Sequence, residues 1–414
     1  FSVGASWRLS NESFMEGTQN WLTNLSLRGS YGTSGNDKLI NSDGNMVYYG
    51  YQATYASYDM YGNAGLQPST LATPGLKWEK NAQFNIAADF TLFNRVNATL
   101  EYYSRESKDL LYYKELPYSS QAGTAKGLNT NLGDIRNSGV EVTLGANIVR
   151  TKDFSWNIDA NWTTQNNRIT YLPGGEYTFT SRVSTYKIAE GHSRWEFFMP
   201  TFAGINPDNG NAMYYIKDDN GNRTTTEDYA KVTLDDYEWH GSTIPKGFAS
   251  VTNSFKWKDV DLSFMFYGSY GAKMFDYVWL ERVTLRNGLG VIQDQVGGRW
   301  RQPGDNASQP RWSYDNYTGT RQPTSYFIFN NDYLRLRNLT IGYSLPKRLL
   351  SKVQISNARL YLTGDNLLTF GAAAKRSTEP ETEVTGNNYN GSELTDNGYP
   401  GTRRVYMGGI QISF

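Results

Sequence analysis

Residues 140–148 read Val140-Glu141-Val142-Thr143-Leu144-Gly145-Ala146-Asn147-Ile148, so apolar and polar side chains alternate along the stretch. Successive side chains of a β-strand point to opposite faces, whereas a helix repeats about every 3.6 residues. A period of two therefore predicts a strand with one apolar face and one polar face.

The same alternation recurs through the chain, most clearly in residues 78–92, 96–102 and 154–163. These segments keep the pattern for roughly 9–14 residues, whereas an ordinary strand has about 5–6 and a tilted membrane-spanning strand about 9–11. The lengths favour an all-β, transmembrane antiparallel β-barrel over a soluble β-sandwich.

Short and long connections alternate between these segments. The short or moderate ones are residues 94–95, 150–153, 256–259, 10–23 and 346–354, and the long ones are 33–76, 106–138, 206–245, 271–332 and 369–402. Structureless loops of such length are unusual in compact soluble domains. Outer-membrane barrels combine short periplasmic turns with long extracellular loops.

The pattern yields 13 expected strands, of which two between residues 177 and 206 are poorly defined. An odd number places the C-terminus in the periplasm if the short turns lie there. An odd, incomplete set cannot close an antiparallel barrel, because open edges in lipid leave backbone groups without partners. We therefore expect the remaining strands to come from preceding sequence or from another chain.

The composition excludes several classes of function. The 40 basic and 40 acidic residues give zero net charge, which provides no field to attract nucleic acid. The absence of Cys and the presence of only His192 and His240 argue against thiol catalysis and Cys- or His-rich metal sites. The mean hydropathy of −0.60 and the lack of a long apolar run argue against a helical membrane protein. We expect no cofactor and no enzymatic activity.

The clearest family resemblance lies near the C-terminus, in Tyr333-Leu334-Arg335-Leu336-Arg337-Asn338-Leu339-Thr340-Ile341-Gly342-Tyr343-Ser344-Leu345-Pro346. Further matching stretches are residues 21–22, 25–36, 76–80, 102–103, 108–111, 139–141, 359–361, 366–370, 399–400 and 403–414, with Asn85, Asp89, Pro117, Asn131, Gly133 and Asn137. Together they resemble the SusC-like (RagA-type) branch of TonB-dependent outer-membrane transporters. Residues 371–379 depart from the family pattern before Pro380-Glu381.

The resemblance implies that residues 1–414 are the C-terminal portion of a 22-stranded barrel, about its last 13 strands. The plug domain and the first strands are expected in preceding sequence, because Phe1 opens directly into a strand-like segment. The terminal Phe414 resembles a barrel-assembly signal. The implied location is the outer membrane of a Gram-negative bacterium.

The implied function is import of an oligomeric nutrient, either a glycan or a peptide. The implied partners are a SusD-like surface lipoprotein that acts as a lid, the TonB complex acting through the preceding part of the protein, and outer-membrane lipid. A dimer of transporter–lid pairs is compatible with the resemblance. Two alternatives remain open: a structural partner barrel in a larger outer-membrane complex, and a soluble carbohydrate-binding or degrading β protein.

In each alternating segment the apolar side chains occupy every second position, and we call this set the apolar parity and the other set the polar parity. We expect the apolar parity to face lipid. The side chains assigned to lipid are Trp78, Phe84, Phe90, Phe154, Trp156, Trp162, Phe264 and Phe266. Aromatic rings near strand ends suit the interfacial girdles of such barrels. Weak candidates for substrate contact are the loop tryptophans Trp195, Trp239, Trp279, Trp300 and Trp312. A loop tryptophan more often packs against its own loop or a partner protein.

Three polar patterns could be interpreted as catalytic or metal-binding sites. In each case the residues favour a structural role. Residues 218–222 read Asp-Asp-Asn-Gly-Asn, but Arg223 and Tyr229 break the spacing of a calcium loop, and we expect turns there. The pairs Asp235 with Asp236 and Glu379 with Glu381 are ordinary in solvated loops, although paired carboxylates also occur in glycosidases. Neither histidine lies in a triad-like context.

The assignment of the apolar parity to lipid can be tested directly. Replacing Ala88 or Ala160 by Arg should block barrel assembly, because a charge on the lipid face near the midplane costs about 2–4 kcal/mol. The same replacement at Asn85 or Asn161 should be mild. Assembly is measured as heat-modifiable migration of the outer-membrane fraction on a gel. Equal tolerance on both faces would contradict the assignment.

Overall fold

The computed structural model describes residues 1–39, 46–116, 118–121, 123, 125, 127–181, 184–276, 279–280, 297–312, 322–350, 355–372, 379–381, 395–396 and 402–413. The chain divides into two compact units. The first unit contains Phe1–Thr143, Thr164–Glu176 and Ala189–Ser193, and the second contains Leu144–Thr163, Tyr177–Ile188 and Arg194–Phe414.

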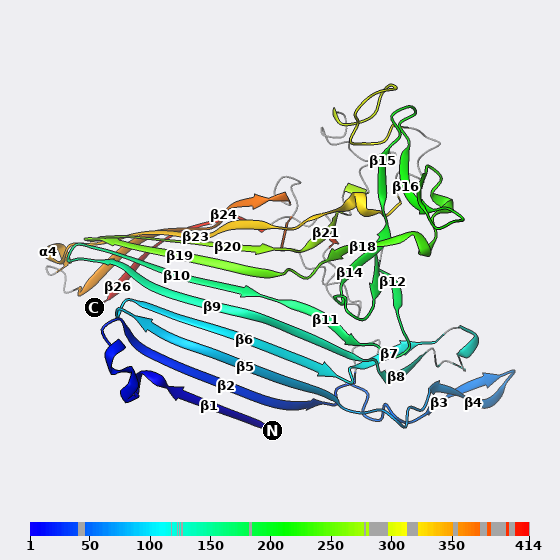
Figure 1. Cartoon of the computed structure of the whole chain (residues 1–414), viewed down its shortest axis with the longest axis horizontal. Helices are drawn as coiled ribbons and strands as arrows, with labels where there is room; N and C mark the ends of the chain where they lie inside the picture. The colour runs from blue at the N-terminus through cyan, green and yellow to red at the C-terminus, as the bar shows by residue number, and fades with distance from the viewer. Residues whose placement is uncertain are drawn as a thin grey trace. The chain divides into compact units, whose positions relative to one another are not determined.

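The first unit consists mainly of long antiparallel strands in the order β1-β2-β5-β6-β9, with β11 also paired to β9 (Figure 1). The bounds are β1 Ser2–Arg8, β2 Leu22–Asn36, β5 Glu79–Leu92, β6 Val96–Lys108, β9 Asp134–Arg150 and β11 Asn166–Tyr171. Two hairpins lie in its connections, formed by β3 Thr54–Met60 with β4 Asn63–Thr70 and by β7 Leu111–Glu115 with β8 Gly127–Asn131. Short 3-10 helices are η1 Leu9–Asn11, η2 Ser13–Thr18 and η3 Tyr118–Ser120.

The second unit continues the main sheet from the end of β9, in the order β9-β10-β19-β20-β23-β24-β26 (Figure 1). The bounds are β10 Phe154–Thr164, β19 Gly247–Trp257, β20 Val260–Tyr270, β23 Tyr333–Ser344, β24 Asn357–Gly371 and β26 Val405–Ser413. The one-turn helix α4 Lys347–Leu350 precedes β24. Among the described residues, no helix has the length and apolar character that a helical membrane span requires.

Three small sheets occupy the long connections of the second unit. The first contains β12 Tyr177–Ser181, β13 Ser184–Ile188, β14 Glu196–Pro200 and β18 Tyr237–Ser242. The second contains β15 Phe202–Ile205, β16 Ala212–Lys217 and β17 Arg223–Thr226. The third contains β21 Lys273–Asp276, β22 Ile328–Asn330 and β25 Thr395–Asp396. The 3-10 helices here are η4 Tyr229–Lys231, η5 Leu234–Asp236 and η6 Ser325–Phe327. The described parts of these long connections therefore contain secondary structure of their own.

The expected all-β, antiparallel fold is confirmed, and the expected strand count needs a correction. In the described part of the chain the main sheet has 12 strands, 11 of them on its continuous path. The two poorly defined strands between residues 177 and 206 belong to the small sheet β12-β13-β14-β18 instead. Short strands in that region bury apolar side chains in a core formed by the loops. Their side chains alternate as those of a barrel strand do, but the strands are shorter.

The register places the alternating side chains as the sequence predicts. In the β5–β6 pair Phe90 lies opposite Ala98, and Ile86 lies opposite Tyr102, so each apolar side chain faces the same way as its neighbour. Ile86 is 52% exposed although it lies within the sheet. Phe84 and Leu100 on the same parity are exposed as well, so the exposed apolar side chains form a patch on this face rather than single residues.

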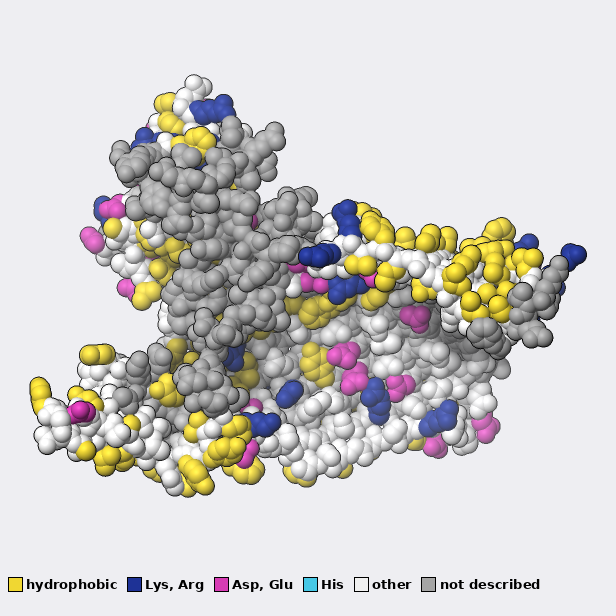
Figure 2. Space-filling view, turned by 180° about the vertical axis from the view of Figure 1, so that it is seen from behind, with side chains coloured by type: hydrophobic (Ala, Val, Ile, Leu, Met, Phe, Trp, Pro, Cys, Tyr) yellow, Lys and Arg dark blue, Asp and Glu magenta, His cyan; other side chains and the backbone are white. Residues whose placement is uncertain are grey.

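The apolar face of β5 and β6 carries charged side chains at one end only. On the apolar parity of β5 and β6 the charged residues Lys80, Glu106 and Lys108 stand together at one end, and Arg136 of β9 pairs with Glu106 at 3.0 Å. Between that end and the opposite turn the parity carries only uncharged residues. In Figure 2 hydrophobic side chains likewise gather over the C-terminal strands, toward the end that carries α4.

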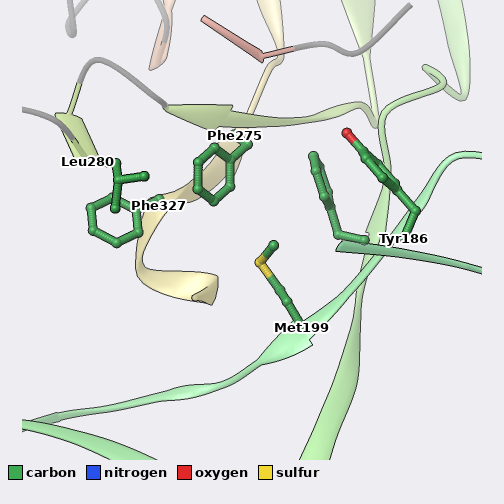
Figure 3. Close-up of a cluster of buried hydrophobic side chains, with 6 residues drawn as sticks. Tyr186, Met199, Phe275, Leu280 and Phe327 are labelled. Carbon is green, nitrogen blue, oxygen red and sulfur yellow. The ribbon is translucent and has the colours of Figure 1, made fainter. Parts of the chain in front are cut away.

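The largest hydrophobic core of the described residues lies within the connections of the second unit. It consists of Tyr186, Phe197, Met199, Phe275, Leu280 and Phe327, and Figure 3 shows these side chains converging from separate segments. Tyr186 stacks on Phe197 with ring centroids 4.9 Å apart. Because the sheet turns one face outward, burial of apolar area is concentrated in these connections.

Candidate functional site

A cavity of about 680 Å³ lies within the second unit, on the polar parity of the sheet. Its floor comes from β19, β20 and β23. Its rim comes from residues that precede or follow these strands and from Pro380 and Glu381, which come after β24. It is lined by Thr243, Ile244, Pro245, Phe248, Met265, Tyr267, Ser269, Ala272, Asn331, Tyr333, Arg337, Pro380 and Glu381. This volume lies within the range of about 300–1,000 Å³ that is usual for small-molecule sites.

Three aromatic rings from three neighbouring strands form one wall of the cavity. Phe248 and Tyr267 stack with centroids 6.4 Å apart and planes at 16°, and Tyr267 and Tyr333 lie 6.1 Å apart at 55°. The register explains the row, because Ser269 pairs with Tyr333 and Phe248 pairs with Ser269 across the two strand junctions. Aromatic side chains on the polar parity are the exception in this sheet.

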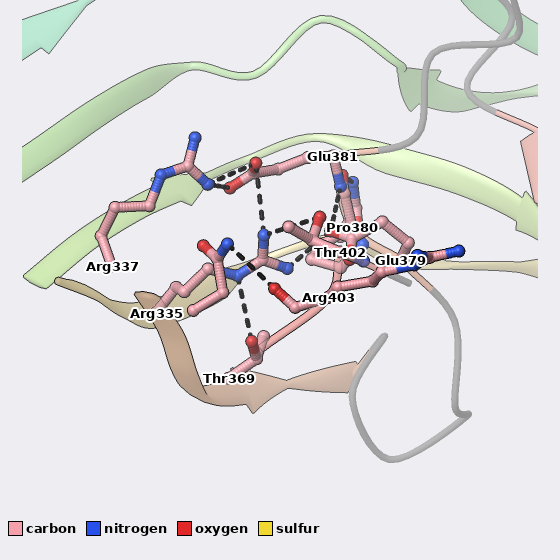
Figure 4. Close-up of polar contacts among 10 residues, drawn as sticks. Arg335, Arg337, Thr369, Glu379, Pro380, Glu381, Thr402 and Arg403 are labelled. Carbon is pink, nitrogen blue, oxygen red and sulfur yellow. Dashed lines mark hydrogen bonds and ion pairs between the residues drawn. The ribbon is translucent and has the colours of Figure 1, made fainter. Parts of the chain in front are cut away.

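A charged network attaches residues 379–381 to the sheet beside the cavity (Figure 4). Arg335 of β23 donates through Nη2 to Glu379 at 2.5 Å and lies 3.3 Å from Glu381, while its Nε donates to Thr369 of β24 at 3.0 Å. Arg337 donates through Nη1 to both carboxylate oxygens of Glu381, at 2.9 and 2.7 Å. Two arginines of one strand therefore hold two carboxylates of one loop.

The two arginines differ in their exposure to solvent. The Arg335 side chain is 2% exposed and that of Arg337 is 41% exposed. The register of β23 shifts between Leu336 and Asn338, which is the mark of a β-bulge. A bulge re-aims side chains, which allows Arg335 and Arg337 to converge on the same loop.

Hydrogen bonds keep Glu379 ionised. Burial opposes the charge, but the backbone N–H of Thr402, the Arg335 side chain and the backbone N–H of Glu381 all donate to the carboxylate, and together they hold its pKa below the usual range. The donor from Thr402 lies 2.6 Å away. The carboxylate thus joins residue 379 to residue 402 as well as to the sheet.

The five candidate tryptophans lie elsewhere. Trp195 and Trp279 pack against the loop core, Trp239 packs on Phe198 at 5.1 Å, and Trp300 donates to the carbonyl of Pro207 at 2.9 Å. Trp312 is 43% exposed and lies under the Arg299 guanidinium at 4.5 Å. None of the five lines the cavity within the described part of the chain, and their role in substrate contact stays a prediction.

The other polar candidates have structural roles in the described residues. The carboxylate of Asp218 accepts hydrogen bonds from the backbone N–H groups of Asn220 and Asn222, so this segment forms a turn. Asp236 caps η5 and accepts from Thr233 and from the backbone N–H of Lys217. His240 contacts Thr201 and the carbonyl of Met199, and burial lowers its pKa. The described residues contain no cluster of His, Asp and Glu suited to a metal ion.

The side chains expected to face lipid all lie on the main sheet, apart from Trp78, which directly precedes β5. Trp78, Phe84 and Trp162 are exposed, and Phe90, Phe154, Trp156, Phe264 and Phe266 are half-buried among neighbouring side chains of the same parity. Phe414 lies outside the described residues.

The sequence reasoning named Glu381 only as half of a carboxylate pair, quoted Tyr333 and Arg337 only for the family resemblance, and did not connect any of them with a cavity. One feature of the sequence could have pointed to the cavity. An aromatic side chain stands at a position whose neighbours on the same face of the strand are polar, as at Phe248, Tyr267 and Tyr333. The roles of Arg335 and Glu379 depend on a contact between residues 44 positions apart, and strand periodicity carries no information about such a contact.

The difference in exposure predicts different costs of removing the two arginines. Arg335→Met should destabilise the folded protein by about 3–5 kcal/mol, because it removes the guanidinium that neutralises the buried Glu379 carboxylate. Arg337→Met, two positions along the same strand, should cost less than about 1 kcal/mol, because an exposed ion pair contributes little. The heat-modifiable transition of the purified protein measures both. Equal losses would show that Arg335 does not anchor the loop.

The ionised state of Glu379 predicts a loss of stability in acid. Its folded-state pKa is lowered, so its contribution is fully present above the unfolded value of about 4.3 and is lost as pH falls through the folded value. The stability difference between the wild type and Glu379→Gln should therefore be constant near neutral pH and shrink below about pH 4. Unfolding midpoints measured against pH test this, and a difference independent of pH would contradict it.

Comparison with known proteins places this architecture in a family. Residues 1–367 match the family model described as TonB dependent receptor-like, beta-barrel. The solved structure entitled "Structure of the RagAB peptide transporter" aligns with a TM-score of 0.76 and 27% identity, covering 100% of this chain and 43% of that one. The RagAB peptide importer in the "open-open" state aligns with a TM-score of 0.77, again with 27% identity, covering 100% of this chain and 42% of that one.

Curated relatives agree with the structural match. TonB-dependent receptor P26 of Formosa agariphila is 28% identical over 100% of this chain and 42% of its own length. TonB-dependent receptor SusC of Bacteroides thetaiotaomicron is 24% identical over 100% of this chain and 40% of its own length. The chain therefore spans about two fifths of the length of the relatives it matches, and it belongs to the TonB-dependent receptor β-barrel family, in the SusC and RagA branch.

Proposed function

We propose that the protein of which this chain is part imports an oligomeric nutrient, a glycan or a peptide, across the outer membrane. TonB supplies the energy, and a SusD-like surface lipoprotein serves as the lid. The observation that carries this proposal is the match of residues 1–367 to the receptor β-barrel, joined to the likeness to the RagAB peptide importer and to SusC. Location in the outer membrane, with the C-terminus in the periplasm, is part of the same proposal.

The apolar parity supports contact with lipid. The exposed side chains Phe84, Ile86, Leu100 and Trp162 occupy the sheet face that carries no charge over most of its height. A charged group there would have to give up its hydration to hydrocarbon. We assign to lipid the eight aromatic positions named from the sequence.

The polar parity supports contact with a wet interior. Arg28 pairs with Asp89 at 3.1 Å and with Glu101 at 2.7 Å, across three neighbouring strands of the first unit. In the second unit Arg359 of β24 forms an ion pair with Asp261 of β20. Partly exposed ion pairs such as these are tolerated beside water, and their location on one parity matches a hydrophilic lumen.

Purification of the full-length protein from native outer membrane tests the proposal. The expected result is a surface lipoprotein that co-purifies with the barrel and a bound oligosaccharide or peptide identified by mass spectrometry. A size measurement on the same material shows whether transporter–lid pairs form dimers. Uptake of the identified nutrient should stop when TonB is deleted, because transport by this family depends on that coupling.

A matched pair of variants provides the control. Asn161→Arg should assemble and still bring the lipoprotein down, whereas Ala160→Arg should lose both the barrel and the lid. Assembly of the wild type in the membrane without a lipoprotein and without TonB-dependent uptake would favour a structural partner barrel. Recovery of the wild type in soluble form would exclude both membrane roles.

A further inference from the structure

A row of basic side chains crosses one end of the apolar parity in the first unit. It consists of Lys80 of β5, Lys108 of β6, Arg136 of β9 and Arg168 of β11, all of them exposed. Lys80 pairs directly with Lys108, and Arg168 pairs directly with Arg136, so the members of each pair point to the same face. An ion pair between Arg136 and Glu106 of β6 at 3.0 Å joins the two pairs. We call these four residues the basic row.

The carboxylates beside the basic row do not neutralise it. Glu106 is shared between two cations, since it lies 3.0 Å from Arg136 and 3.4 Å from Lys108. Asp134, the neighbouring residue of the same parity on β9, accepts a hydrogen bond from the backbone N–H of Asp109 at 3.0 Å. The two outer members of the row form no ion pair within the described part of the chain. Four cations beside two carboxylates leave an excess of positive charge on this surface.

The arrangement of the basic row is unfavourable without an anionic partner. Like charges directly opposite each other on neighbouring strands destabilise a sheet. The row contains two such pairs, Lys80 with Lys108 and Arg136 with Arg168. An anion that lies between the side chains of a pair removes this repulsion. Two such pairs on one face therefore indicate a partner that carries negative charge.

The position of the basic row along the strands corresponds to the headgroup level of a membrane. On β5 the uncharged positions of this parity run from Ala82 to Leu92. These ten residue steps extend about 33 Å along the strand and about 25 Å along the membrane normal at a tilt of about 40°, which is the height of the apolar band in outer-membrane barrels. Lys80 is the next residue of the parity beyond this band. Figure 1 shows this end of β6 and β9 beside the β7–β8 hairpin, on the side of the long connections.

Exposed apolar side chains adjoin the basic row. Trp78, two positions before Lys80 on the same parity, is exposed, as are Phe84 of β5 and Tyr102 of β6 on the other side of the row. Aromatic rings are common at the level where hydrocarbon meets the headgroups. A partner that fits this surface presents an anionic group to the basic row and apolar chains to the rings. Such a partner is an amphiphile.

We propose that the basic row binds the phosphate groups of an anionic lipid in the outer leaflet of the outer membrane. Ammonium and guanidinium groups donate charge-assisted hydrogen bonds to phosphate oxygens, and the acyl chains lie against the apolar side chains of β5 and β6. The inference rests on the proposed function, which puts this sheet in the outer membrane with its long connections outside. It assigns to the apolar parity a specific lipid site, in addition to general contact with hydrocarbon.

Lipid binding by the purified full-length complex tests the inference. The probes are diphosphoryl lipid A, the same lipid after removal of both phosphates, and inorganic phosphate. Each is added to the delipidated complex in dodecyl maltoside micelles, and bound lipid is counted by native mass spectrometry over a concentration series. The diphosphoryl lipid should bind about tenfold more tightly than the dephosphorylated one, and about 0.5 M salt should reduce this difference because the charges are exposed. Inorganic phosphate at the same concentration should not displace the lipid, because it lacks acyl chains.

Variants on the two ends of one hairpin provide the matched comparison. Lys80→Gln and Lys108→Gln should each weaken binding of diphosphoryl lipid A about threefold, and the double variant should weaken it about tenfold and lose the preference for phosphate. Arg95→Gln removes an exposed cation from the turn at the opposite end of the same two strands and should bind as the wild type does. Heat-modifiable migration shows that each variant has assembled.

Several outcomes would overturn the inference. They are equal binding of the two forms of lipid A, unchanged affinity in the double variant, an equal loss in Arg95→Gln, and displacement of the lipid by inorganic phosphate, which would show a site for the free ion. Loss of the lipoprotein from the double variant with lipid binding intact would show that the basic row contacts a protein. TonB-dependent uptake by the wild type alongside any of these results would leave the import function standing. Absence of the wild type from the outer membrane would mean that the proposed function itself is wrong.

Discussion

Each inner strand of the main sheet satisfies its backbone N–H and C=O groups by pairing with the strands on both sides, and this requirement fixes where its side chains point. A slip of one residue would turn the apolar side chains of a strand toward the polar face. In hydrocarbon the constraint is stricter still, since no water can replace a lost partner. The continuous registers of β5 with β6 and of β19 with β20 show the constraint met over 13 and 11 residue pairs.

The same register creates the cavity. Tyr267 lies opposite Arg335, and Ser269 lies opposite Tyr333, so rings and guanidinium groups alternate across the β20–β23 junction on one face. The bulge at Arg337 brings a second guanidinium toward the loop. Hydrogen bonding of the backbone thus determines both the surface that is compatible with lipid and the site that is compatible with a polar ligand.

Sequence periodicity was sufficient to predict the long strands. The expected strand at residues 78–92 is β5, Glu79–Leu92, and the turn expected at residues 256–259 separates β19 from β20. Periodicity failed between residues 177 and 206, where short strands join a loop sheet. Such strands are stabilised by contacts with distant residues, as when Tyr186 packs with Phe275 and Phe327 in one core. The cavity is hidden for the same reason, because its parts come from positions 243–272, 331–337 and 380–381.

The attachment of the last long loop has an evolutionary consequence. Arg335 holds Glu379 at one end of that connection and lies 3.3 Å from the Thr402 hydroxyl at the other, while Glu379 accepts from the Thr402 backbone. Both ends are thus fastened to one buried guanidinium. An insertion or deletion between residues 382 and 401 would leave both anchor points in place, so the length of this connection can change in evolution while residues 379–381 and 402 stay attached to the sheet.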